Sequence, residues 1–203
     1  MGIILKGQIM YSIFKRGLDI LVSIIALPFM LLLTMVLGTL IYLEDKGPIF
    51  YKSTRIGRGG KKLDMLKFRS MKVNAPDFRN LDGSTWNSAN DPRVTKIGKF
   101  LRETSLDETA QFFNVLKGDM SLIGPRASTW DALGTYKSDE MDKLKVRPGI
   151  TGYTQAYFRN DLPAREKRLK DAWYANNENL WLDTKIFFKT IQTVVMKKKL
   201  YTN

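Results

Sequence analysis

The feature of the chain that most constrains its fold is an uncharged stretch of 24 residues, 20–43. As one helix it would reach roughly 36 Å, enough to cross a bilayer core of about 30 Å. Pro28 interrupts the stretch and predicts a kink, because proline removes a backbone hydrogen bond inside a helix. The arms on either side of Pro28 would be about 12 and 24 Å long, so neither arm spans a bilayer alone.

The charges that flank this stretch bear on its topology. Basic residues lie on both sides of it: Lys6, Lys15 and Arg16 before, and Lys46, Lys52, Arg55, Arg58, Lys61 and Lys62 after. Because basic flanks prefer the cytoplasmic side, we favour a re-entrant helix-break-helix anchor over residues 1–45, with a single transmembrane helix as the alternative. We expect the Ser23 hydroxyl to bond a carbonyl freed by Pro28, since lipid offers no partner.

Composition narrows the chemistry of the remaining part, residues 46–203, which we expect to form one catalytic domain. The chain has 33 Lys and Arg against 20 Asp and Glu, a formal net charge of +13, and neither His nor Cys. A basic surface favours anionic partners such as phosphates, nucleic acid or acidic lipid. The missing residue types exclude disulfides, the common zinc ligand sets and any Ser-His or Cys-His nucleophile pair.

The pattern of the domain predicts an α/β fold, mostly helical with a small sheet. Strands are expected at residues 49–54 and 62–68, a polar surface loop at 74–92, and helices at 96–103, 105–117, 138–146, 163–176 and 182–197. Tight turns are expected at residues 124–126 and 147–149. The last helix places apolar residues on one side, which indicates a core face, with the membrane interface as the alternative: Leu182, Ile186, Phe187, Ile191, Val194 and Val195.

A pair of carboxylates, Asp107 and Glu108, follows Ser105 in a pattern that fits a capping box. The pair also lies between Arg102 and the turn that carries Arg126, in a chain without the usual nucleophiles. A helix N-terminus and nearby arginines would favour an ionised Asp107, which could attack phosphorus without a general base. Mg²⁺ held by Glu108 and arginine contacts to the phosphoryl oxygens would offset the repulsion between the anions.

Five stretches in order resemble the small monotopic phosphoglycosyl transferases of the bacterial sugar transferase family. They are Lys67-Phe68-Arg69-Ser70-Met71, Leu101-Arg102 with Ser105-Leu106-Asp107-Glu108, Asn114-Val115-Leu116-Lys117-Gly118-Asp119-Met120-Ser121, Ile123-Gly124-Pro125-Arg126, and Arg147-Pro148-Gly149-Ile150-Thr151-Gly152. With the interrupted anchor, they cover nearly the whole chain.

The resemblance implies a re-entrant membrane helix, interfacial amphipathic helices and a monotopic protein on the cytoplasmic face of the bacterial inner membrane. It also implies transfer of a sugar-1-phosphate from a UDP-sugar to polyprenyl (undecaprenyl) phosphate, with release of UMP, as the first membrane step of a surface glycan pathway. In that family the aspartate of an Asp-Glu dyad is the covalent nucleophile, and the glutamate is a Mg²⁺ ligand. These roles carry over to Asp107 and Glu108, which we call the dyad. Arg102 and Arg126 match phosphate contacts, and Lys67, Arg69 and Arg147 match motif positions to which we assign the same role or packing around the site.

Two departures from the family pattern concern the sugar. Ala127 follows the Gly-Pro-Arg turn where the family often has Pro and later Glu, and Asp131 is the nearest acid. Tyr157, Phe158, Arg159 and Asn160 replace a frequent Asn-Gly-Arg-Asn, so Tyr157, Arg159 and Asn160 are candidates for reading the nucleotide or sugar. The sugar, which we expect to be an N-acetylated amino sugar or a hexose, and the oligomeric state, with a homodimer as one option, stay open.

A membrane-tethered protein that binds polyanions through its charge is the alternative. Against it, Lys and Arg are spread along the chain instead of clustering with stacking aromatics, and it gives Asp107 and Glu108 no role. We therefore expect no nucleic-acid partner.

Overall fold

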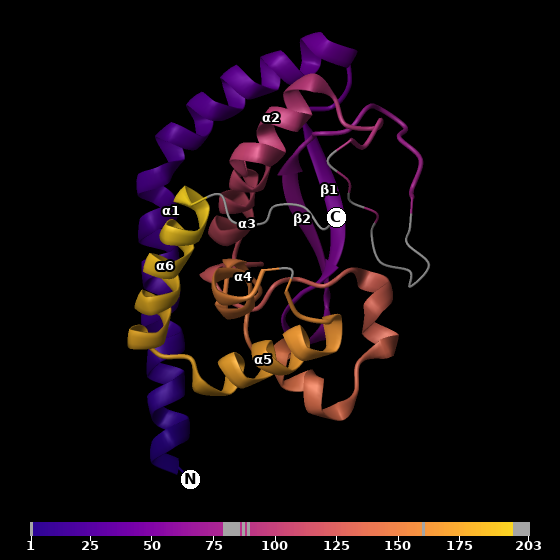
Figure 1. Ribbon diagram of the computed structural model, residues 1–203. Coiled ribbons are helices and arrows are strands. Elements are labelled where there is room, and N and C mark those ends of the chain that lie inside the picture. The colour runs from indigo at the N-terminus through magenta and orange to yellow at the C-terminus, as the bar shows by residue number, and fades with distance from the viewer. Residues whose placement is uncertain (1, 79–85, 87, 89, 160, 197–203) are drawn as a thin grey trace.

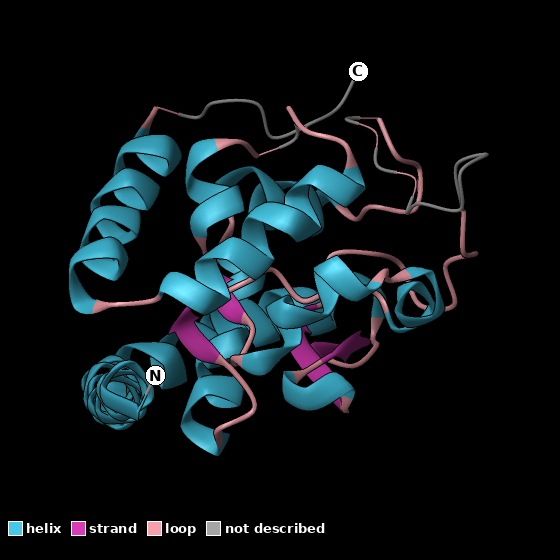
Figure 2. Cartoon of the chain, turned by 90° about the horizontal axis from the view of Figure 1, so that it is seen from below, coloured by secondary structure: helices cyan, strands magenta, loops and turns pink. Residues whose placement is uncertain are grey.

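The computed structural model describes residues 2–78, 86, 88, 90–159 and 161–196 of the chain (Figure 1). Helices predominate, and the strands form two separate two-stranded sheets among them (Figure 2). The predicted class, a mostly helical α/β fold, is confirmed, with two small sheets in place of one.

One long helix, α1 (Gly2–Asp45), runs along one side of the molecule and bends over its upper end in Figure 1. The helix continues through Pro28, so the predicted break between two helices is not found and a bent helix replaces it. The expected role of Ser23 is also wrong, because its buried hydroxyl bonds no residue that the structure describes. Within the described part of the chain, Ile9–Asp45 is long and apolar enough to cross a membrane.

The two sides of α1 have different surroundings. Met30, Leu37 and Ile41 are buried and share a core with Phe68 and Leu101. Other large apolar side chains of α1 are exposed: Ile24, Ile25, Phe29, Leu32, Met35 and Leu43. An exposed apolar surface of this extent is typical of membrane contact.

The predicted strands at 49–54 and 62–68 are confirmed as the antiparallel hairpin of β1 (Phe50–Ile56) and β2 (Lys62–Phe68). The register pairs Phe50 with Phe68 and Ile56 with Lys62. The short 3-10 turn η1 (Arg58–Gly60) joins the strands and contains Gly59 at a φ of 67°, a conformation that glycine adopts without strain. The hairpin supplies the strand on which the predicted site lysine, Lys67, lies.

The predicted helix at 96–103 is confirmed as α2 (Lys96–Thr104). The helix expected over residues 105–117 is instead a 3-10 segment, η2 (Leu106–Ala110), followed by α3 (Gln111–Lys117). Gly118 ends α3 at a φ of 97°, as predicted. The amide of buried Asn114 accepts a hydrogen bond from Leu66 N at 2.8 Å and donates one to Asp64 O at 2.8 Å, which fixes α3 against β2.

The second sheet pairs β3 (Ser121–Ile123) with β4 (Gly149–Thr151) in parallel. These strands flank the two predicted turns, and the backbones meet so closely that a Cβ on Gly149 would lie 2.1 Å from Gly124 N. Between the strands lie two 3-10 segments, η3 (Trp130–Thr135) and η4 (Ser138–Lys145). The segment η4 occupies the place of the helix predicted at 138–146.

Three helices follow β4 in the described residues: α4 (Tyr153–Tyr157), α5 (Ala164–Asn177) and α6 (Leu180–Val195). The helices predicted at 163–176 and 182–197 correspond to α5 and α6, although residue 197 lies outside the described residues. The core face predicted for the last helix is only partly confirmed: Ile186 is buried, whereas Phe187, Ile191 and Val194 are exposed. The expected loop at 74–92 lies partly outside the described residues, and its described part contains no helix or strand.

Candidate active site

The carboxylate pair lies on η2, between the end of α2 and the start of α3. Ser105 has a φ of 59°, and its N–H bonds the carbonyls of Arg102 and Leu101, so this residue closes α2. An N-cap requires extended backbone, and the Ser105 side chain makes no capping hydrogen bond. The capping box is therefore wrong, and no cap engages the carboxylate of Glu108.

Lys67 reaches both carboxylates from β2. Its Nζ donates a hydrogen bond of 2.7 Å to Glu108 Oε1 and lies 3.7 Å from Asp107 Oδ2. The Asp107 side chain is 11% exposed, against 26% for Glu108. One ammonium group thus offsets the repulsion between two adjacent carboxylates that are largely buried.

The two carboxyl groups differ in their pKa. Burial raises the pKa of Asp107, the charge of Lys67 opposes this, and the neighbouring Glu108 raises it further. Burial also acts to raise the pKa of Glu108, but the charges of Lys67 and Arg126 outweigh it and lower this pKa to about 2. The expectation that a helix N-terminus and arginines would favour ionised Asp107 is thus corrected: η2 is a 3-10 segment of five residues, and burial has the largest effect on the pKa of Asp107.

Arg126 approaches the pair from the turn after β3. Its Nη2 lies 3.8 Å from Glu108 Oε1, and its side chain is 57% exposed, which leaves the guanidinium accessible to a ligand. The turn is held firmly, because Gly149 N bonds Pro125 O at 3.0 Å and Gly124 N bonds Thr151 O at 2.8 Å. The close glycine contact between β3 and β4 therefore places Arg126 beside the dyad.

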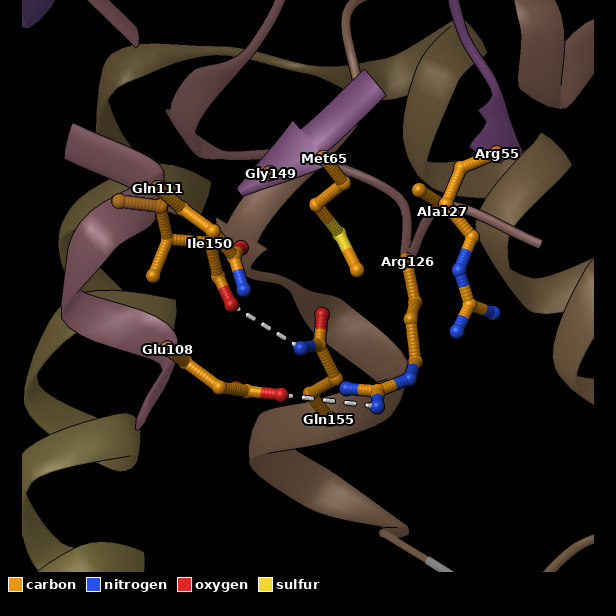
Figure 3. Close-up of a pocket in the computed structure, with 9 residues that line it drawn as sticks. All are labelled: Arg55, Met65, Glu108, Gln111, Arg126, Ala127, Gly149, Ile150 and Gln155. Atoms are coloured by element: carbon orange, nitrogen blue, oxygen red, sulfur yellow. Dashed lines mark hydrogen bonds and ion pairs between the residues drawn. The ribbon is translucent and has the colours of Figure 1, made fainter. Parts of the chain in front are cut away.

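Glu108 and Arg126 line one pocket of the protein (Figure 3). Three polar residues of its lining were not among the site residues predicted from the sequence: Arg55, Gln111 and Gln155. The charge of Arg55 contributes to the lowered pKa of Glu108, which places it within electrostatic reach of the dyad. Glutamine lacks a distinctive spacing signal, and Arg55 was visible in the sequence only as one of many basic residues after the apolar stretch.

Arg102 lies within electrostatic reach of Asp107 and bonds a residue of a neighbouring segment. Its Nε donates a hydrogen bond of 2.9 Å to Ser70 Oγ, and its charge acts to lower the pKa of Asp107. Its role as a phosphate contact stays a prediction.

Two other predicted phosphate contacts have partners elsewhere. Buried Arg69 donates hydrogen bonds to Pro48 O at 2.6 Å and to Asp45 Oδ2 at 2.7 Å, at the end of α1. The Nε of Arg147 donates to Gly118 O at 2.8 Å, at the end of α3. These contacts are packing contacts, the alternative to phosphate binding for both residues, and neither residue lines the pocket of Glu108 and Arg126.

The residues proposed to read the nucleotide or sugar lie at the end of α4. Tyr157 packs on Tyr153 with ring centroids 5.2 Å apart and lines a second pocket with residues of α6. Arg159 has a φ of 45° and donates to Thr193 O at 3.3 Å. Asn160 lies outside the described residues, and the reading role of all three stays a prediction.

The carboxylates of Asp107 and Glu108 are chemically suitable ligands for the expected Mg²⁺. Mg²⁺ is commonly held by one or two carboxylates together with substrate phosphates and water. The described residues contain no group of three or more His, Cys, Asp or Glu side chains that could hold a metal, but Glu108 offers an ionised carboxylate at the pocket. The pocket lining also contains the amide oxygen of Gln155, a neutral oxygen with no hydrogen-bond partner among the residues that the structure describes.

Comparison with known proteins shows to which family the chain belongs. The pattern of the bacterial sugar transferase family matches residues 10–197 of the chain. The chain belongs to the bacterial sugar transferase family. This membership favours a transferase over the alternative of a polyanion-binding protein.

Three relatives show the range of the family members that this chain resembles. The chain is 39% identical over 201 residues to the UDP-N-acetylgalactosamine-undecaprenyl-phosphate N-acetylgalactosaminephosphotransferase of Aeromonas hydrophila, with 96% of the chain and 46% of that protein covered. It is 40% identical over 197 residues to the UDP-glucose:undecaprenyl-phosphate glucose-1-phosphate transferase of Klebsiella pneumoniae, with 93% and 42% covered. It is 36% identical over 199 residues to the exopolysaccharide production protein ExoY of Rhizobium meliloti (strain 1021), with 92% and 88% covered. The chain thus spans less than half the length of the first two relatives and most of the length of ExoY.

Proposed function

We propose that this protein transfers a sugar-1-phosphate from a UDP-sugar to polyprenyl phosphate, as a member of the small phosphoglycosyl transferases. The relatives named for this reaction support the proposal, since they use UDP-sugars and undecaprenyl phosphate by their names. The observation that carries it is the contact of Lys67 with both Asp107 and Glu108 beside a pocket that Arg126 also lines.

The proposed reaction has two steps. In the first, a carboxylate oxygen of Asp107 attacks the phosphorus that bears the sugar; an aspartyl-phosphosugar bond forms, and the bond to UMP breaks. In the second, an oxygen of polyprenyl phosphate attacks the same phosphorus, and Asp107 leaves as a carboxylate. Both attacks join anions, so the cations Lys67 and Arg126, with Arg102 nearby, lower the barrier by offsetting the negative charge.

Glu108 is the proposed ligand of Mg²⁺. The ion, when bound, neutralises charge on the phosphates. The lowered pKa of Glu108, about 2, keeps its carboxylate ionised at neutral pH and available to a cation. Lys67, which now bonds Glu108, would then be free to interact with phosphoryl oxygens.

The sugar is proposed to be an N-acetylated amino sugar or a hexose. The names of the relatives include N-acetylgalactosamine, galactose and glucose, so the family membership does not choose among them. A panel of UDP-sugars assayed for UMP release is the direct way to identify it.

Residues 1–45 are proposed to anchor the catalytic domain, 46–203, as a monotopic protein on the cytoplasmic face of the bacterial inner membrane. The exposed apolar side of α1 supports membrane contact, and the basic flanks support a re-entrant arrangement. The prenyl tail of the acceptor would then stay in lipid while its phosphate reaches Asp107. This reaction would be the first membrane step of a surface glycan pathway.

The test of the function is the release of UMP from a UDP-sugar in the presence of polyprenyl phosphate and Mg²⁺. The wild type should release UMP, and rapid quenching should trap a phosphosugar adduct on the peptide that carries Asp107. Asp107→Asn should abolish both signals, whereas Glu166→Gln, at an exposed acid in the first turn of α5, should keep them. Substantial turnover by Asp107→Asn would remove this residue from the role of nucleophile.

A further inference from the structure

The amide oxygen of Gln155 is buried and has no hydrogen-bond partner among the described residues. Its Nε2 donates a hydrogen bond of 3.1 Å to Ile150 O, which fixes the orientation of the amide. In Figure 3 the oxygen is turned into the ring of side chains that lines the pocket of Glu108 and Arg126. A buried acceptor without a hydrogen-bond partner is unfavourable, which makes this oxygen a candidate for contact with a ligand.

The chemistry of the pocket limits what this ligand can be. Arg126 and Arg55 make the pocket suitable for phosphate groups, but phosphate oxygens at neutral pH are acceptors, and so is the oxygen of Gln155. A direct phosphate contact therefore leaves this oxygen unsatisfied. A metal cation satisfies it and binds phosphate at the same time.

We propose that the amide oxygen of Gln155 is a direct ligand of the Mg²⁺ ion that Glu108 holds, an assignment that rests on the proposed function. Mg²⁺ takes six oxygen ligands in near-octahedral geometry, and an amide oxygen is a suitable hard ligand. A neutral oxygen adds a ligand without adding a negative charge that would repel the diphosphate of the donor. Gln155 and Glu108 line the same pocket, from α4 and η2 respectively.

The fold holds Gln155 in place. Its helix, α4, begins directly after Gly152, where a Cβ would lie 1.9 Å from Gly124 O. This close approach packs the start of α4 against the turn that carries Arg126. The proposed metal ligand and the phosphate-binding arginine therefore share one rigid support, as a precise coordination site requires.

The first test measures metal binding without turnover, with Mn²⁺ as the probe in the presence of UDP, by electron paramagnetic resonance. Gln155→Leu removes the oxygen and should weaken Mn²⁺ binding by roughly ten-fold or more. Gln155→Glu keeps an oxygen there and adds charge, so in the absence of UDP it should bind Mn²⁺ at least as tightly as the wild type. Asn177→Leu, at an exposed amide at the end of α5, is the control and should not change the affinity.

The second test uses the absence of cysteine from the chain. Gln155→Cys introduces a single thiol, which as a thiolate binds Cd²⁺ far better than Mg²⁺. Added Cd²⁺ should give a thiolate-to-metal absorption band, and the band should weaken when Glu108→Gln is added to the same chain. Gln192→Cys is the control for adventitious thiol binding.

Mn²⁺ affinity within two-fold of the wild type in Gln155→Leu would overturn the assignment, because the oxygen is then satisfied by water or by Arg126. Circular dichroism would check that the variant folds. If it does not fold, Gln155→Cys decides: a Cd²⁺ band no stronger than that of Gln192→Cys overturns the assignment. Failure of the proposed function has a different signature, since the wild type would then release no UMP whatever its Mn²⁺ affinity.

Discussion

Lys67 donates a hydrogen bond of 2.7 Å to Glu108 and so joins the hairpin to the segment that carries the dyad. The same ammonium lies 3.7 Å from Asp107, the more buried of the two carboxylates. Asn114 lies on α3, directly after η2, and its side-chain oxygen accepts a hydrogen bond from Leu66 N on β2. This bond holds β2 close to η2. The electrostatics of the dyad therefore depend on a side chain forty residues earlier in the sequence.

Removing the charge of Lys67 should slow the proposed reaction. Without the ammonium the two carboxylates repel each other and the phosphates lose a cation, so Lys67→Met should lower kcat by roughly 10²-fold. Lys67→Arg, which keeps the charge, should lower it less. UMP release measures both effects, with Lys61→Met, at an exposed lysine just before β2, as the control. A Lys67→Met enzyme that kept half of its kcat would contradict the role.

Gly98 should be intolerant of a methyl group, although alanine is the better helix former by about 1 kcal/mol. A Cβ at this position of α2 would lie 1.9 Å from Ser70 O, a backbone atom that also accepts a hydrogen bond from Thr95 N. Because backbone cannot move aside cheaply, Gly98→Ala should destabilise the protein by about 1–3 kcal/mol. It should also displace Arg102, whose Nε bonds Ser70 Oγ.

The measurement for Gly98→Ala is thermal unfolding in detergent micelles, together with UMP release. A Cβ on Gly134 would meet no atom within 4 Å, so Gly134→Ala is the matched control and should leave both quantities unchanged. An unfolding midpoint of Gly98→Ala equal to that of the wild type would show that α2 packs less tightly on Ser70 than the structure describes.

The local elements of the fold could be predicted where the local sequence pattern determines the structure by itself. The hairpin has glycine-rich turn residues between two short strands, and it was predicted from them. The helix α2 was also predicted, and the structure adds its cap, the Thr95 side chain, which accepts a hydrogen bond from Gly98 N. The prediction failed where tertiary contacts determine the local conformation. The Ser105 pattern suits a capping box, but Ser105 closes α2 in a left-handed conformation. Pro28 removes only local bonds, and the packing of Met30 in the core supports a helix that continues past it.

The site was predictable in part for a similar reason. Asp107, Glu108, Lys67 and Arg126 belong to motifs with distinctive residues, and the structure places their side chains together. Gln155 gives no such signal, because the orientation of its amide is set by Ile150 O. Which of many arginines reach the dyad depends on the pairing of β3 with β4, which the sequence pattern did not reveal.

Buried Glu140 should make stability depend on acid pH. Burial acts to raise its pKa, but hydrogen bonds from Lys137 N and Arg168, with the charge of Arg165, outweigh it and hold the pKa below the ordinary 4.5. The folded state then binds fewer protons than the unfolded state in acid. The stabilisation is thus complete above the unfolded pKa and is lost as the pH falls through the folded value.

Glu140→Gln tests this contribution through unfolding midpoints measured between neutral and acid pH. At neutral pH the variant should be destabilised by roughly 3 kcal/mol, because two arginines lose a buried partner. The difference from the wild type should shrink as the pH falls below about 4.5. Glu166→Gln, at an exposed acid in the first turn of α5, should differ little from the wild type at any pH. A difference for Glu140→Gln that stayed constant with pH would point to packing instead of charge.

The topology of α1 can be tested with single cysteines, because the chain has none of its own. Gly7, where a Cβ would meet no atom within 4 Å, and exposed Lys52 lie on opposite sides of the apolar stretch. A re-entrant anchor places both positions on the cytoplasmic side, as their basic surroundings favour. Gly7→Cys and Lys52→Cys should then react with a membrane-impermeant maleimide only in inverted membrane vesicles. Labelling of Gly7→Cys from the outside of intact cells would establish a transmembrane helix instead.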